Sequence, residues 1–139
     1  MRRTESFRQQ HQEILQIVKE MAAGLDPQKL AKDAGPMRSL LSKLVGKVSM
    51  HLTMEDNSLY PLLIAGKDAA ASQTAKVFQT EMGGIKTTFT AYAQRWPLAS
   101  DIQAQPAQFV SETKQIFAAL GNRIEKEEND LYVKADKAA

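Results

Sequence analysis

The sequence contains no cysteine, and this absence removes several classes of function. Without thiols the chain can form no disulfide, thiolate zinc site, iron–sulfur cluster or cysteine nucleophile. Histidine is nearly absent as well, because the 139 residues include only two. Any imidazole ligand of a metal ion must therefore come from His11 or His51.

The sequence also lacks a long apolar run and an excess of one charge. No apolar stretch approaches the roughly 18 residues that a membrane-spanning helix needs, so we expect no membrane association. Eighteen Lys and Arg oppose sixteen Asp and Glu, and the basic residues are scattered, so we expect no nucleic-acid partner. The basic start, residues 1–7, runs into polar residues instead of an apolar segment, which argues against a signal peptide and predicts a cytoplasmic protein.

Length and composition predict one globular domain. A chain of 139 residues, 43% hydrophobic and 24% charged, corresponds to a single domain over residues 1–139. No stretch shows sustained alternation of apolar and polar residues with β-branched enrichment, so no sheet is expected. The fold class is therefore all-α.

Four amphipathic segments account for most of the chain. They cover residues 4–23, the stretch after Pro36, residues 69–96 and residues 106–133. Pro61 should kink or interrupt the second segment, and residues 97–105 are predicted to form a loop. A short helix or turn is expected after Asp26-Pro27, where an N-cap residue precedes a proline. Four such helices joined by short loops predict an up-down-up-down antiparallel four-helix bundle.

Polar side chains interrupt the apolar faces of these segments at one level along each helix. A charge that points inward costs free energy unless it is paired or binds a metal ion, so several at one level indicate a common site. In the second and fourth segments the polar residues are four apart and share one helix face. The residues concerned are His11, His51, Glu55, Lys86, Arg123 and Glu127.

A faint internal repeat links the second and fourth segments. Residues 51–60 align with residues 123–132 without a gap, and both copies have Glu at the fifth position and Leu-Tyr at the last two. A duplication of an ancestral helix pair would leave such a pattern.

With these residues the chain resembles the hemerythrin family in its bacterial, hemerythrin-like (HHE) cation-binding form. The resemblance implies a four-helix bundle around a non-haem di-iron centre, in proteins that carry or sense dioxygen or handle iron. In that family one iron takes two terminal histidines, the other takes three, and two carboxylates bridge them. The matching features are His11, His51-x-x-x-Glu55 with Leu59-Tyr60-Pro61, Glu81-Met82, and Arg123-x-x-x-Glu127-Glu128 with Leu131-Tyr132.

Residue by residue, the resemblance implies a degenerate di-iron site. One half-site is retained: His11 and His51 match the terminal histidines, and Glu55 and Glu127 match the bridging carboxylates. The other half-site is lost. Its three histidine positions are taken by Met82, Lys86 and Arg123.

Two hypotheses follow from this substitution pattern. In the first, Lys86 and Arg123 neutralise Glu55 and Glu127 through charge-assisted hydrogen bonds, and the core is a charge network that is metal-free or binds metal weakly. In the second, the retained residues hold a single metal ion, for which iron is favoured by the resemblance and manganese and zinc are also suitable.

The corresponding function classes are a non-enzymatic sensor or carrier, with a metal ion or a small ligand such as dioxygen as partner, and an interaction module. The module would have an unknown protein partner or would form homo-oligomers. No separate acid–base pair or substrate loop is evident, so an enzyme is not expected.

Overall fold

The computed structural model describes residues 3–138, and it is helical along almost all of that range, with no strand in it. Met1 and Arg2, which belong to the basic start of the sequence, and Ala139 lie outside the described residues. Among the helices that are described, none has both the length and the apolar character that crossing a membrane requires. The prediction of an all-α fold is therefore confirmed.

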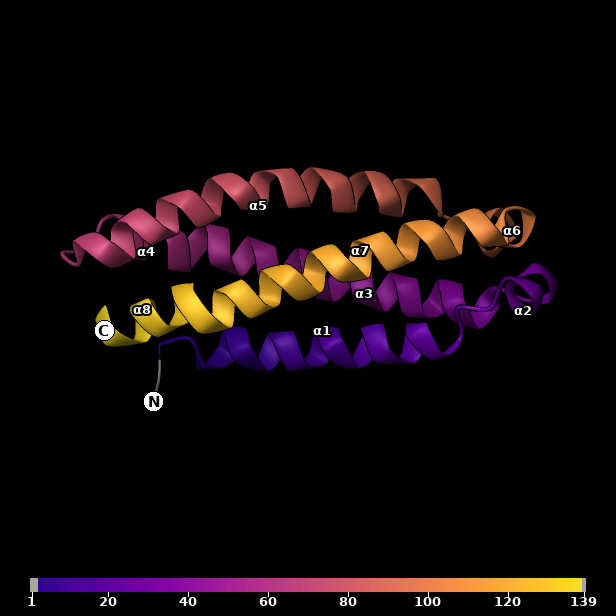
Figure 1. Ribbon diagram of the computed structural model, residues 1–139, viewed down its shortest axis with the longest axis horizontal. Helices are drawn as coiled ribbons and strands as arrows, with labels where there is room; N and C mark the ends of the chain where they lie inside the picture. Colours follow the sequence, from indigo (N-terminus) through magenta and orange to yellow (C-terminus); the bar gives the residue numbers. More distant parts are fainter. Residues whose placement is uncertain (1–2, 139) are drawn as a thin grey trace.

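Four long helices lie along the long axis of the molecule: α1 (Glu5–Ala23), α3 (Gly35–Met54), α5 (Ala69–Arg95) and α7 (Pro106–Lys126). Each runs opposite to the one before it, as Figure 1 shows. α1 packs along α3, and α5 contacts α7. The buried residues of each helix recur every three or four positions, which places them on one face toward the interior.

Two short helices cover one end of the molecule (Figure 1). α2 (Pro27–Lys32) begins where the Asp26 carboxylate accepts a hydrogen bond from the Gln28 amide at 2.9 Å. The expected loop over residues 97–105 is wrong, because that segment contains α6 (Ala99–Ala104). Ile102 of α6 is fully buried, so it fixes this short helix to the core.

At the other end, each of two long helices passes through a π-helical turn and then resumes as an α-helix. α3 continues through η1 (Glu55–Leu59) into α4 (Tyr60–Ile64). α7 continues through η2 (Glu127–Leu131) into α8 (Tyr132–Ala138). Pro61 follows the first turn by two residues, whereas Val133 stands at the same place after the second, so the turn does not depend on Pro61.

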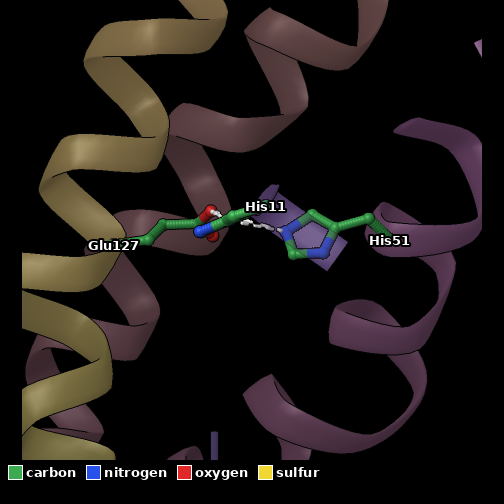
Figure 2. Close-up of side chains that lie close together, drawn as sticks. All are labelled: His11, His51 and Glu127. Atoms are coloured by element: carbon green, nitrogen blue, oxygen red, sulfur yellow. Dashed lines mark hydrogen bonds and ion pairs between the residues drawn. The ribbon is translucent and has the colours of Figure 1, made fainter. Parts of the chain in front are cut away.

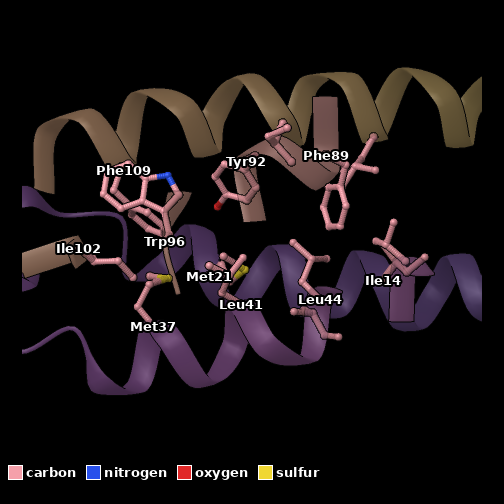
Figure 3. Packing of buried hydrophobic residues seen from close by; sticks show 14 of the residues in the cluster. Ile14, Met21, Met37, Leu41, Leu44, Phe89, Tyr92, Trp96, Ile102 and Phe109 are labelled. Carbon is pink, nitrogen blue, oxygen red and sulfur yellow. The ribbon is translucent and has the colours of Figure 1, made fainter. Parts of the chain in front are cut away.

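The apolar core has two parts with a polar level between them. The larger part fills the α2–α6 half of the molecule and includes Trp96 and Phe109 (Figure 3). The smaller part lies between the π-helical turns and the start of α5. Along α1, His11 falls between Phe7 of the small cluster and Ile14 of the large one. The two clusters hold the polar level in place, since full burial of each large apolar side chain contributes about 1.5–3 kcal/mol.

Candidate metal centre

Three helical segments bring His11, His51 and Glu127 together at this polar level (Figure 2). His11 Nε2 lies 3.1 Å from His51 Nε2 and 3.0 Å from Glu127 Oε1. None of the three residues is more than 3% exposed. Their ligand atoms all lie within 4.8 Å of one another, close enough for one metal ion to contact them together.

The outer nitrogens of both imidazole rings determine which way the inner nitrogens face. His11 Nδ1 is 2.9 Å from a Glu128 carboxylate oxygen, and His51 Nδ1 is 2.6 Å from the Gln10 side-chain carbonyl. Both oxygens can only accept, so each Nδ1–H donates outward. Each Nε2 is then left to face the centre. A histidine that binds a metal ion usually has this same outward hydrogen bond, which fixes its ring and tautomer.

Glu55, the first residue of η1, is fully buried beside this group. Its Oε1 lies 3.2 Å from His51 Nε2, and its Oε2 accepts a hydrogen bond from the Tyr132 hydroxyl at 2.8 Å. Glu55 thus contacts the centre through His51 and Tyr132, and the cluster of ligand atoms that lie within 4.8 Å of one another comprises the two histidines and Glu127.

Burial and mutual charge shift the acid–base behaviour of these groups. Burial, together with the negative charge of Glu127, raises the pKa of Glu55 to about 8. Burial alone would lower the pKa of His51, but hydrogen bonds to Glu127 and Glu55 outweigh it and raise the pKa to about 9. Burial would raise the pKa of Glu127, but hydrogen bonds from His11 and His51 hold it well below its usual range. Without a metal ion, therefore, the buried carboxylates keep a proton close to them.

Arg123, which the resemblance matched to a lost histidine position, is buried beside this group. Its guanidinium donates to the Tyr60 hydroxyl at 2.9 Å and to the Phe78 carbonyl at 2.8 Å, and it lies 3.5 Å from a Glu81 carboxylate oxygen. It also stacks 4.5 Å from the centre of the Phe78 ring. Arg123 Nε is 3.8 Å from Glu127 Oε2. A guanidinium has no lone pair to offer a metal, so the residues present do not fit a second ion here.

Lys86 does not join this network, and its expected inward position is wrong. Its side chain is 53% exposed, and its ammonium group pairs with Asp56 at 3.2 Å. The buried face of α5 includes Met82 and Phe89, with Ile85 half-buried, so Lys86 lies at the edge of that face. Its long side chain reaches water and avoids the cost of burying a charge.

Met82 packs in the core and lines a small cavity that adjoins the centre. The cavity measures about 20 Å³ and is also bounded by His51, Arg123 and Glu127. This is room for one molecule about the size of water. An open groove of about 270 Å³ lies outside it between α5 and α7. The cavity and the groove share the side chains of Ile85, Phe89 and Leu120.

Three residues that contact the histidines were not predicted as part of the site. Tyr132 and Glu128 belong to the repeated motif, but the motif does not indicate that they contact His11. Gln10 carried no signal, because its contact with His51 crosses from one helix to another and depends on how α1 is rotated against α3.

The comparison with protein families matches residues 2–135 to the hemerythrin HHE cation binding domain. Neither the comparison with curated proteins nor that with solved structures finds a significant match. The family match spans nearly the whole chain and confirms the resemblance seen in the sequence. A buried group of two histidines and a carboxylate is consistent with a domain described as cation-binding. The chain therefore belongs to the hemerythrin HHE cation-binding family.

Proposed function

We propose that this protein binds a single metal ion through His11, His51 and Glu127, and that it acts as a non-enzymatic sensor or carrier of a small ligand. The observation that supports this most directly is the pair of outward hydrogen bonds from the two Nδ1 atoms. They leave two imidazole nitrogens and a carboxylate oxygen facing one point in the interior. Such a convergence of electron-pair donors calls for a cation at its centre.

The overall arrangement agrees with this proposal. We infer that α1, α3, α5 and α7 form an up-down-up-down bundle of the hemerythrin type, in which side chains on facing helices build a site inside the bundle.

Arg123 and a metal ion are compatible, because Glu127 has two oxygens with different neighbours. Oε1 faces His11 at 3.0 Å, whereas Oε2 lies 3.8 Å from Arg123 Nε. The guanidinium can neutralise one side of the carboxylate while the other side binds metal. Its positive charge also repels a cation and draws charge from Glu127, so we expect weaker binding than in a site without it.

The donor set limits the choice of metal. Two imidazoles with carboxylate oxygen suit iron, manganese or zinc in the divalent state. Iron is favoured because of the resemblance to hemerythrins. When bound, the ion would supply a Lewis-acidic centre beside the small cavity.

The cavity favours a small ligand over an organic substrate. Its volume of about 20 Å³ accommodates a molecule such as dioxygen and nothing much larger. The residues that line it are mostly apolar, apart from His51, Arg123 and Glu127. We therefore propose ligand binding without catalysis.

The test is metal content, measured by mass spectrometry on untagged protein purified without chelator after growth with added iron, manganese and zinc. We expect one ion per chain, lost in His51→Ala and kept in Lys86→Ala, which removes an exposed cation outside the centre. Protein that holds no metal, even after incubation with these ions, would instead support a metal-free charge network and an interaction module. Two ions per chain would show that Arg123 does not replace the second metal.

A further inference from the structure

The Tyr132 hydroxyl lies inside the candidate metal centre, although the sequence pattern gave this residue no ligand role. Tyr132 is fully buried at the start of α8. Its oxygen is 3.2 Å from His11 Nε2 and 3.4 Å from His51 Nε2, and its ring stacks on His11 with centroids 5.2 Å apart. No other tyrosine hydroxyl is recorded in contact with either histidine in the part of the chain that the structure describes.

The single hydroxyl hydrogen is directed away from the histidines. It is donated to Glu55 Oε2 at 2.8 Å, the shortest contact of this hydroxyl. Toward the two imidazole nitrogens the phenol oxygen therefore presents lone pairs. It adds a further electron-pair donor to the group already formed by His11, His51 and Glu127.

The spacing of these four atoms matches a ligand set around one ion. The five distances recorded among His11 Nε2, His51 Nε2, Glu127 Oε1 and the Tyr132 oxygen run from 3.0 to 3.6 Å. Tetrahedral ligands at bond lengths of about 2.0–2.2 Å are about 3.3–3.6 Å apart. A metal ion could thus be held with little movement of the side chains.

The matching residue of the other motif copy shows that this placement is specific. Tyr60 is also fully buried and also follows a π-helical turn. Its hydroxyl instead accepts a hydrogen bond from Arg123 at 2.9 Å. A buried tyrosine at this motif position therefore does not face the histidines by default.

We propose that Tyr132 is the fourth ligand of the metal ion, bound as a phenolate, and that the site prefers iron(III). This inference rests on the proposed function, because it requires that the centre binds metal. On binding, the Tyr132 O–H bond breaks, its proton is released to solvent, and the phenolate oxygen donates an electron pair to the ion. Two anionic oxygens, from Glu127 and Tyr132, offset much of the charge of a trivalent ion, and tyrosine is an established ligand of iron in proteins.

The experiment uses the full chain loaded with one equivalent of iron(II) without oxygen, oxidised with ferricyanide and desalted. We expect a phenolate-to-iron(III) absorption band in the visible range, with resonance Raman vibrations of a coordinated phenolate. Tyr132→Phe should lose both signals and bind iron about tenfold more weakly or worse. Tyr60→Phe is the matched control and should keep both signals. If Tyr132→Phe does not fold, incorporation of ring-deuterated tyrosine into the unaltered chain should shift the same vibrations.

The outcomes separate the two proposals. Iron bound in the unaltered protein without phenolate vibrations, or vibrations that persist in Tyr132→Phe, would overturn the role of Tyr132 and leave the metal site standing. A chain that binds no iron, as judged by mass spectrometry, would overturn both.

Discussion

The two copies of the ten-residue motif share a backbone path and differ in their chemistry. In each, a glutamate opens a π-helical turn, and Leu-Tyr closes it and starts the next helix. The first residue is His51 in one copy and Arg123 in the other. Each tyrosine serves the opposite copy: Tyr60 accepts a hydrogen bond from Arg123 at 2.9 Å, and Tyr132 lies 3.4 Å from His51.

The difference shows that the first residue of the motif decides how the negative charge of a buried carboxylate is neutralised. Around His51 the compensation must come from outside the chain, as a proton or a metal ion, because imidazole nitrogens face the carboxylates. Around Arg123 the compensating positive charge belongs to the chain itself, as the guanidinium group. The π-helical turn occurs in both copies, so this backbone feature does not depend on the residue that compensates the charge.

The largest expected effect comes from removing the buried positive charge of Arg123. Arg123→Leu removes the group that donates to the Tyr60 hydroxyl and to the Phe78 carbonyl, together with the positive charge beside Glu127. Breaking a buried pair in this way should lower the free energy of unfolding by about 3–5 kcal/mol. Urea unfolding of chelator-treated protein, followed by circular dichroism, measures it. An unchanged midpoint would place the guanidinium in water.

The second largest effect is the pH dependence of the free energy of unfolding. We expect it to arise mainly from His51 and Glu55, which belong to the first motif copy. The pKa of His51 is raised to about 9 in the folded protein, so its stabilising contribution is complete below about 6.5 and is lost as the pH rises through about 9. The pKa of Glu55, raised to about 8, acts in the same direction. The lowered pKa of Glu127 contributes stability that is complete above about 4.5 and constant over this range.

The metal-free protein should therefore lose stability between pH 6.5 and pH 9, as measured by urea midpoints in chelator. Saturating zinc should flatten this dependence, because the metal ion takes the place of the protons. A midpoint that rises with pH would contradict the assignment.

A smaller effect is expected from the residue that orients a histidine ring. Glu128→Ala removes the acceptor of the His11 Nδ1 hydrogen bond at 2.9 Å. Loss of such a partner typically costs 10- to 100-fold in metal affinity, so we expect zinc affinity to fall by about that factor in a competition with a chromophoric chelator. Glu125→Ala removes an exposed carboxylate on the same helix and is the control. Equal affinities in the two variants would mean that the hydrogen bond does not orient the ring.

Periodicity in the sequence was enough to locate the long helices, but not the local departures from them. The predicted segment 69–96 closely matches α5 (Ala69–Arg95), because an apolar face repeats over many turns. α6 was missed, since six residues offer too few repeats. The π-helical turns were missed as well, because a single widened turn is too short to show in the periodicity of apolar residues.

The candidate site was predictable only where a residue stands near the middle of a buried face. His11 and His51 are such residues, and the structure brings them together. Lys86 stands at the edge of its face, where a small helix rotation decides between core and solvent. The contact between Gln10 and His51 joins two helices, and single-helix spacing carries no information about it.

The smallest expected effect comes from replacing Lys86, the cation outside the core, and it contrasts with the effect of replacing the buried Arg123. Lys86→Leu is the same kind of substitution as Arg123→Leu, but it removes a half-exposed ammonium group paired only with Asp56 in the described residues. Exposed ion pairs contribute about 0–1 kcal/mol, so unfolding should shift by no more than that and bound metal should be unchanged. A loss comparable to that of Arg123→Leu would mean that both cations compensate the buried carboxylates, and the contrast between the motif copies would then rest on two residues instead of one.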